Sequence, residues 1–396
     1  MAGYRITESY EDLRKQVRAF AAEIVRPLVP IMERDREVRH DLAKAIARQG
    51  WTSATVDPEY EGLGLGHYAK TVILEELARE NGAAAAIAQA GIIPTGALVH
   101  FGTDEQKNTW LPAIAAGDCL PAIDVTEPGT GGDVLAMRSR GERVDERTYV
   151  LNGRKVCVGN SHVATLHLVV VRTAEGSGGL TAFLVEADRP GISCPAHVPF
   201  LGLNGFSCGE VALTDCRVPV ANRVGEEGDG LLVAHAASIL YGRPNLAALS
   251  LGLQQAAWEG VAERVKDERL RVHQTIQQRI GDIHRRLITS RVVLYDAVNR
   301  LDNGLACDEE LIAAKLEVVK AAETTTREAL NVHGAREGLF VDHPAERRFR
   351  DAHCIEFPAG TSDFQRYRLS LEALGRRNRP LSERFATPRQ RAEVPA

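Results

Sequence analysis

The sequence predicts an α+β protein of several domains, with an all-α N-terminal domain, a small middle β domain and a C-terminal four-helix bundle. Three observations support this prediction. The chain has 396 residues, which is longer than a single domain usually is. Apolar residues recur at helical spacing before about residue 118 and after residue 230, whereas the middle consists of short alternating runs separated by turn residues.

The N-terminal domain, expected over residues 1–118, should consist of helices joined by short loops. In its first helix the apolar side chains fall on one face and the charged ones elsewhere, as in a helix packed on a core. The expected helices span 8–36, 40–49, 67–81, 83–101 and 104–116. The stretch 56–66 is expected to be a loop, because proline and glycines interrupt the periodicity.

The middle domain, expected over residues 119–229, should be a small antiparallel sheet. Short β-branched or alternating runs occur at 120–126, 148–151, 166–172, 180–186 and 209–214. The dipeptide Asn152-Gly153 follows the second run, and Asn-Gly is the strongest short hairpin signal. The sequence therefore predicts a hairpin turn at this dipeptide.

The C-terminal region, expected over residues 230–376, should form a bundle of four long helices. The candidates span 231–263, 274–303, 308–332 and 363–375. Pro244 is expected to kink the first of them just after Arg243. Residues 377–396 are rich in Arg, Pro and Glu and are expected to form a flexible tail.

The composition excludes several classes of function. A net charge of −5 gives no electrostatic argument for nucleic-acid binding. The first residues lack the order of a signal peptide, and no apolar run is expected to span a bilayer, so we expect a cytoplasmic protein without a membrane partner. The seven cysteines are scattered, with no Cys-x-x-Cys pair and no histidine cluster at metal spacing, so neither a metal nor a disulfide framework is expected.

Two stretches suggest a more specific function. Residues 126–133 read Thr-Glu-Pro-Gly-Thr-Gly-Gly-Asp, a turn whose exposed N–H groups can approach a phosphate or a flat ring. Residues 149–155 follow as an alternating run that ends in Asn-Gly-Arg-Lys. Together the two stretches resemble the middle-domain signature of the acyl-CoA dehydrogenase family, flavoproteins that oxidise acyl thioesters with FAD. Residues 215–225 also resemble the family, as does the α–β–α order over residues 8–376.

The resemblance implies a set of cofactor-binding positions. They are Val125, Thr126, Gly131, Gly132, Cys157, Gly159, His273, Gln274, Asn331, Gly334, Thr361 and Asp363. Three of them depart from the family: Gly132 replaces a serine, Cys157 an aromatic residue, and Gly159 a threonine that hydrogen-bonds the flavin. In relatives the contact at His273-Gln274 is often made across a subunit interface, so a homodimer or homotetramer is expected.

The resemblance also locates the catalytic base, and here the departure is larger. In relatives a carboxylate removes the α-proton of the thioester, either just before Gly-Thr-Ser or just before an arginine of the first C-terminal helix. These positions are Ala359 and Gly242, and neither residue can accept a proton. The backbone N–H of residue 359 is retained and can still polarise a carbonyl. The expected substrate-binding residues are therefore Arg243, Ala359 and Gly360.

Two other residues are candidates for a substitute base. Glu356 lies three residues before Ala359, although a glutamate there can equally be solvated or ion-paired. Tyr241 precedes Gly242, but an unperturbed phenol has a pKa of about 10, so a packing or hydrogen-bonding role is the alternative.

Two hypotheses follow. In the first, the chain is an FAD-dependent oxidoreductase that acts on an acyl thioester of CoA or of a carrier protein by non-standard chemistry. Residues 240–243 and 334–338 resemble family members from natural-product pathways, which suits such a role. In the alternative, the chain is a catalytically silent or half-site subunit that pairs with a competent paralogue. The sequence identifies neither the acyl chain nor the electron acceptor.

Overall fold

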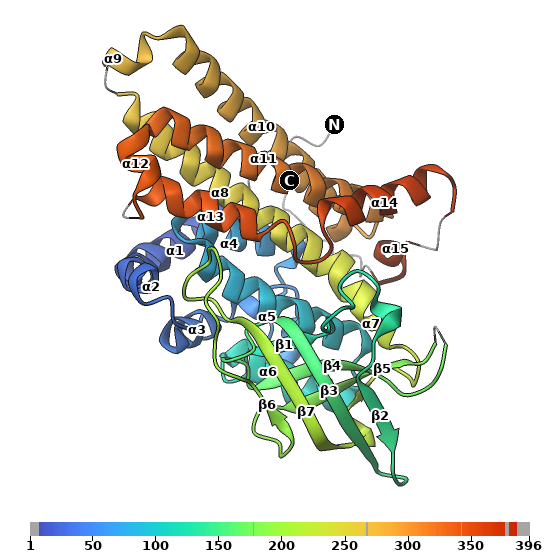
Figure 1. The fold of residues 1–396 in the computed structure, drawn as a ribbon. Helices are drawn as coiled ribbons and strands as arrows, with labels where there is room; N and C mark the ends of the chain where they lie inside the picture. Colours follow the sequence, from blue (N-terminus) through green and yellow to red (C-terminus); the bar gives the residue numbers. More distant parts are fainter. Residues whose placement is uncertain (1–7, 177, 267, 342, 377–379, 386–396) are drawn as a thin grey trace.

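The computed structural model describes residues 8–176, 178–266, 268–341, 343–376 and 380–385. The sheet lies at one end of the molecule, and the long C-terminal helices extend from it to α9 at the opposite end (Figure 1). The predicted succession of a helical, a β and a second helical part is therefore confirmed.

All five expected N-terminal helices are present, although the first is divided. The helices are α1 (Glu8–Phe20), α2 (Val29–Asp35), α3 (His40–Ala47), α4 (Gly66–Glu80), α5 (Gly82–Phe101) and α6 (Asp104–Ala116). A π turn (Ala21–Val25) and a 3-10 turn (Arg26–Leu28) separate α1 from α2. The prediction of one helix over 8–36 is wrong here, because Pro27 lacks the N–H that a continuous helix needs.

Helix α5 corrects the expectation that no apolar run is long enough to span a bilayer. Its length and composition would allow it to cross a membrane, with a mean hydropathy of 1.5. However, 89% of the relevant window is buried inside the protein, as in the core helix of a globular fold.

The middle domain is an eight-stranded sheet in the order β6-β7-β3-β2-β4-β5-β8, with β1 paired to β4. The strands are β1 (Pro121–Asp124), β2 (Arg140–Arg143), β3 (Thr148–Gly159), β4 (Leu166–Arg172), β5 (Leu180–Glu186), β6 (Ile192–Ser193), β7 (Cys208–Pro219) and β8 (Arg223–Val224). The prediction of a purely antiparallel sheet is wrong, because β4 pairs in parallel with both β1 and β2. Since β2 and β3 intervene along the chain, β4 can return beside β1 in the same direction.

The hairpin predicted at Asn152-Gly153 is also wrong, because both residues lie inside strand β3. The pairing of β3 with β7 shifts register between Leu151 and Gly153, which marks a β-bulge. A Cβ at Gly153 would lie 2.0 Å from Ser139 Oγ, so the close approach of Ser139 requires glycine at this position.

The C-terminal part contains more helices than the four expected. They are α7 (Gly230–Ala237), α8 (Arg243–Arg264), α9 (Glu268–Arg271), α10 (Gln274–Asp302), α11 (Asp308–His333), α12 (Ala335–Leu339), α13 (Pro344–Cys354), α14 (Ser362–Ala373) and α15 (Leu381–Phe385). A π turn, η7 (Ser238–Gly242), interrupts the expected helix 231–263. Pro244 lies in the first turn of α8, where proline is tolerated, so the interruption comes before Arg243 and not after it.

The tail predicted to be flexible contains a docked helix. The backbone N–H groups of Leu381 and Ser382 donate to the Asp308 carboxylate at 2.9 and 2.8 Å. Phe385 packs on Phe101, with ring centroids 4.9 Å apart. Helix α15 is therefore fixed to the start of α11 and the end of α5. Residues 377–379 and 386–396 lie outside the described residues.

Candidate functional site

The Gly-rich loop, residues 126–133, follows β1 and is held by a buried ion pair. Glu127 Oε1 lies 2.7 Å from Lys155 Nζ, on strand β3. The same carboxylate accepts hydrogen bonds from the backbone N–H groups of Arg138 and Ser139 at 2.7 and 3.0 Å. Burial alone would raise the pKa of Glu127, but the Lys155 contact outweighs it and lowers that pKa. Glu127 thus fixes both ends of the loop to the sheet.

The outer side of this loop is open. A Cβ added at Gly129 or Gly131 would meet no atom within 4 Å, and one at Gly132 would meet only Phe364 Cδ2, at 3.9 Å. Phe364 belongs to α14, so the loop of the β domain faces the start of this C-terminal helix. A phosphate or a flat ring can therefore approach the backbone here.

The start of α14 contains two of the predicted cofactor residues. The Thr361 hydroxyl accepts a hydrogen bond from the Phe364 N–H at 3.3 Å and so caps the helix. Asp363 lies in the first turn and pairs with Arg366 at 2.7 Å. Through Phe364, both residues lie near the Gly-rich loop.

The two positions of the family base converge on one point. A Cβ at Gly242 would lie 3.3 Å from the Ala359 Cβ and 3.7 Å from Ile93 Cδ1. The π turn η7 brings Gly242 to this point, and such turns are frequent at functional sites. The point is thus reached from two separate elements, and neither supplies a carboxylate.

Hydrogen bonds to its carbonyl groups hold the turn around Ala359 in place. Ala359 has a left-handed φ of 52°, and Gly360 follows with φ of 90°. Lys315 Nζ donates to the Gly360 carbonyl at 2.7 Å, and Gln365 Nε2 donates to the Ala359 carbonyl at 2.8 Å. Among the described residues no acceptor contacts the Ala359 N–H. This donor therefore remains available to a ligand.

Arg243, next to Gly242, has a buried guanidinium with spare hydrogen-bonding capacity. The residue is 4% exposed, and its Nε donates to Gln365 Oε1 at 2.9 Å. Its buried Nη1 has no partner among the described residues. Burial and the nearby charge of Arg368 lower the pKa of Arg243 to about 9. An uncharged or anionic oxygen from a ligand would satisfy this group.

Both candidates for a substitute base have other partners. Glu356 Oε1 accepts the Ser362 N–H at 3.0 Å, and its Oε2 lies 3.4 Å from Lys320 Nζ. The Tyr241 hydroxyl lies 3.0 Å from His100 Nε2, and burial raises the pKa of this tyrosine. The geometry therefore gives Glu356 a role in the turn and Tyr241 a role in packing. It does not support either residue as the base.

The end of β3 differs from the family pattern in shape as well as in residue type. Cys157 is exposed at a register shift of the strand, with φ of 56°. A Cβ at Gly159 would lie 3.1 Å from both Ala90 and Phe206. A threonine at position 159 would require Phe206 to move. The sequence analysis did not identify Phe206 as part of the site. The available signal was a large aromatic residue within the glycine-containing stretch 202–209.

The predicted cofactor residues fall into two groups. Val125 and Thr126 belong with the Gly-rich loop, since Lys155 Nζ donates to the Val125 carbonyl at 3.2 Å and the Val156 N–H to the Thr126 carbonyl at 2.8 Å. The other group is exposed near the start of α10 and the end of α11, at the end of the molecule opposite the sheet (Figure 1). Its members are His273, Gln274, Asn331 and Gly334. The fold does not bring these residues to the loop of the same chain.

A cavity of about 960 Å³ lies between α7, the start of α11, α14 and α15. Its wall includes Ile239, which belongs to the same π turn as Gly242. Four carboxylates and two guanidiniums line it: Asp308, Glu309, Glu310, Glu372, Arg368 and Arg384. Helix α15 thus forms part of the wall of a large, predominantly acidic cavity beside the candidate site.

One histidine cluster corrects the expectation that no such cluster exists. Ligand atoms of His333, Glu337 and His343 lie within 4.8 Å of one another. However, His343 Nδ1 accepts the Ala345 N–H at 3.2 Å, so the neutral ring carries its proton on Nε2. That nitrogen lies 3.5 Å from the Glu337 carboxylate and suits a donor better than a metal ligand.

Comparisons with known proteins agree with this architecture. The family models for the N-terminal, middle and C-terminal domains of acyl-CoA dehydrogenase match residues 7–118, 122–216 and 228–373. An acyl-CoA dehydrogenase of Bacillus subtilis is 31% identical over 93% of this chain and 99% of its own length.

Two solved structures are similar over nearly the whole chain. Butyryl-CoA dehydrogenase of Megasphaera elsdenii has a TM-score of 0.90 and 26% identity, covering 94% of this chain and 100% of its own. A prolyl acyl-carrier-protein oxidase has a TM-score of 0.86 and 25% identity over the same shares. The chain belongs to the acyl-CoA dehydrogenase family of FAD-dependent oxidoreductases that act on acyl thioesters.

Proposed function

We propose that this protein oxidises an acyl thioester without a carboxylate base at either usual position. The observation that carries the proposal is the convergence of Gly242 and Ala359 beside two unused donors. These donors are the Ala359 N–H and the buried Nη1 of Arg243. A site of this kind can bind and polarise a thioester carbonyl, although it does not supply the usual proton acceptor.

The residues present fit FAD with fewer side-chain contacts than in relatives. The open backbone around Gly131 and Gly132 suits the diphosphate, and Thr126 and Thr361 border it. Cys157 and Gly159 offer little to the flavin ring, since glycine has no side chain and a thiol is a weak donor. When bound, FAD takes up the two electrons that the substrate loses.

The chain's own residues then perform two tasks. The Ala359 N–H is placed to donate to the thioester oxygen, which makes the neighbouring α-hydrogen more acidic. Lys315 and Gln365 hold the turn in this orientation by donating hydrogen bonds to the carbonyl groups of Gly360 and Ala359. The α-proton must pass to water or to a basic group of the substrate itself, which is why we propose non-standard chemistry.

The cavity beside the site suits an acyl group attached to a carrier protein better than one attached to CoA. The cavity beside the site carries four carboxylates against two guanidiniums, and α15 forms part of its wall. The nucleotide of CoA would bring several negative charges into this acidic space, whereas a carrier's pantetheine arm brings one phosphodiester. The likeness to a prolyl acyl-carrier-protein oxidase supports this proposal. It also supports a place in natural-product biosynthesis.

We further propose a cytoplasmic homodimer or homotetramer. The second group of cofactor residues, at the end opposite the sheet, would then contact the FAD of a neighbouring subunit. One observation favours the alternative, in which a silent subunit pairs with a paralogue. Phe206 and Ala90 lie against the Cβ position of Gly159.

A visible absorption spectrum of the purified protein tests these proposals first. We expect a flavin spectrum close to one FAD per chain, and bleaching of that spectrum by carrier-bound acyl thioesters under anaerobic conditions. A colourless protein that does not take up added FAD would contradict the enzymatic proposal and favour the silent subunit. Faster bleaching by the same acyl group on CoA would contradict the carrier preference alone.

A further inference from the structure

A second cavity, of about 430 Å³, lies between α2, α4, α8 and α13. Its wall contains four arginines and two glutamates: Arg26, Arg79, Arg347, Arg348, Glu80 and Glu259. It shares no lining residue with the cavity beside the candidate active site. The cations therefore exceed the carboxylates by two in a partly enclosed space.

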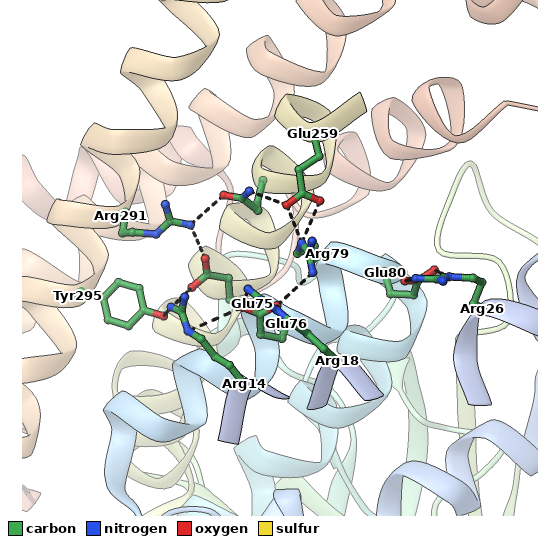
Figure 2. A network of polar contacts seen from close by, with 11 residues as sticks. Arg14, Arg18, Arg26, Glu75, Glu76, Arg79, Glu80, Glu259, Arg291 and Tyr295 are labelled. Atoms are coloured by element: carbon green, nitrogen blue, oxygen red, sulfur yellow. Dashed lines mark hydrogen bonds and ion pairs between the residues drawn. The ribbon is translucent and has the colours of Figure 1, made fainter. Parts of the chain in front are cut away.

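Both carboxylates in this wall are already engaged. The two oxygens of Glu80 accept hydrogen bonds from Arg26 at 2.9 and 2.7 Å. The two oxygens of Glu259 lie 2.8 and 2.9 Å from Arg79 Nε. Figure 2 shows the Arg79–Glu259 pair within a larger network that joins α1, α4, α8 and α10, and the Arg26–Glu80 pair beside that network. Neither glutamate is left to neutralise a further arginine.

The other two arginines lack a carboxylate partner among the described residues. Arg347 donates only a long hydrogen bond, 3.5 Å, to the Glu80 backbone carbonyl. The Nε atoms of Arg347 and Arg348 are buried and have no hydrogen-bond partner. Burial, followed by the charge of Arg347, lowers the pKa of Arg348 to about 10. Two adjacent guanidiniums are thus held together without a direct ion pair, although the charges of Glu259, Glu80 and Asp351 favour the charged form of Arg348.

One further carboxyl group, that of Asp351, lies nearby and favours the charged form of Arg348 without forming an ion pair with it. The carboxyl of Asp351, one turn along α13, accepts the Leu203 N–H at 2.6 Å, and burial raises its pKa to about 6. Beyond the cavity, Arg348 Nη1 and His333 Nε2 lie 3.0 and 3.4 Å from the Cβ position of Gly260. The positive end of the α13 dipole also points to the wall, where Pro344 begins the helix.

We propose that this cavity binds a phosphate dianion, either a phosphate monoester or a diphosphate, through Arg347 and Arg348. A planar guanidinium matches the geometry of phosphate oxygens and binds them with two parallel hydrogen bonds. A dianion would offset the excess of two cations in the wall and accept hydrogen bonds from the guanidiniums of Arg347 and Arg348, which line the cavity. The site is independent of the function proposed above, because none of its residues contacts Gly242 or Ala359.

Isothermal titration of the purified protein, with its own cofactor bound, tests the site. The probes are inorganic phosphate and pyrophosphate, titrated at constant ionic strength set with chloride. We expect saturable binding to the unmodified protein, with pyrophosphate binding more tightly. Arg348→Met keeps an unbranched apolar stem but removes the guanidinium and its charge, and we expect it to weaken binding at least tenfold.

Two further variants complete the test. Arg285→Met removes the same charge from α10, at a side chain that is 62% exposed and pairs only with Asp282; we expect it to bind phosphate like the unmodified protein. Arg347→Met replaces Arg348→Met if the latter does not fold. Unchanged affinity in the cavity variants, or no saturable binding to the unmodified protein, would overturn the proposal.

Discussion

Three lysines are fully buried among the described residues, and two of them, Lys155 beside the Gly-rich loop and Lys70 on α4, have different kinds of partner. Lys155, on β3, lies 2.7 Å from the Glu127 carboxylate. Lys70, on α4, contacts His67 Nδ1 at 2.9 Å and lies 4.9 Å from the centre of the Tyr241 ring. Burial lowers the pKa of both, but Glu127 opposes this for Lys155, whereas the pKa of Lys70 falls to about 7.

This difference extends to the surroundings of each lysine. The β side keeps a satisfied ion pair that holds the loop 126–133, where we propose that the cofactor binds. On the helical side, no carboxylate stands at Gly242 or Ala359, where we expect the base from the family resemblance, and Arg243 has an unpartnered Nη1 among the described residues. Under the function proposed above, the chain therefore keeps the means of holding FAD more completely than the means of moving a proton.

The largest expected effect comes from breaking the satisfied pair. Glu127→Ala leaves Lys155 buried without a counter-charge and frees the N–H groups of Arg138 and Ser139. Removing one partner of a buried pair costs about 3–5 kcal/mol, so we expect a loss of this order in unfolding free energy and loss of bound FAD. Chemical denaturation and the flavin spectrum measure both, with the exposed Glu142→Ala as control. A stable, yellow Glu127→Ala protein would contradict the anchoring role.

The next largest effect should come from restoring a carboxylate. Ala359→Glu places an acid where Gly242 leaves space for it, and a positioned general base contributes at least about 100-fold to a rate. We expect this gain in the anaerobic reduction of the flavin by acyl thioesters, measured by stopped flow. Ala359→Gln has the same size without a basic group and should give no gain. Equal rates for both variants would show that the site lacks more than a base.

The sequence predicts the fold well because its signals are local. The amphipathic pattern of α1 and the apolar runs of β4 and β5 depend on neighbouring residues; β4 and β5 occur where expected, and α1 begins where expected but ends at Phe20. Asn152-Gly153 has the local signature of a turn, but its surroundings decide otherwise, since β7 pairs along the whole of β3 and Ser139 fills the space above Gly153. Tertiary pairing here outweighs turn propensity.

The site is predictable only in part for the same reason. The absence of a base at Ala359 and Gly242 can be read from residue types. A Cβ at Gly242 would lie 3.3 Å from the Ala359 Cβ, and this convergence depends on a π turn that no local sequence pattern predicts. Likewise, the contact of Phe206 with the Gly159 position and the docking of α15 on Asp308 join residues far apart in the chain. Such contacts require the assembled structure.

The smallest effect at neutral pH concerns Lys70, which has no carboxylate of the described residues at hydrogen-bond distance, because its effect appears only when the pH is raised above 7. The pKa of Lys70 is about 7 in the folded protein, against about 10.5 for an exposed lysine. Between these values the unfolded chain binds more protons, so stability should rise with pH, by up to roughly 1.4 kcal/mol per unit. Below pH 7 the lysine is charged in both states, and its contribution becomes constant.

Lys70→Met should flatten this rise when unfolding free energies are measured by denaturant titration from pH 6 to 10, whereas the exposed Lys44→Met should keep it. Lys155 is not expected to produce a comparable rise, because Glu127 favours its charged form. A pH profile that is the same for Lys70→Met and the unmodified protein would mean that Asp302, whose charge favours protonation of Lys70, compensates the lysine as fully as Glu127 compensates Lys155. The contrast between the two lysines would then lie in their geometry and not in their charge.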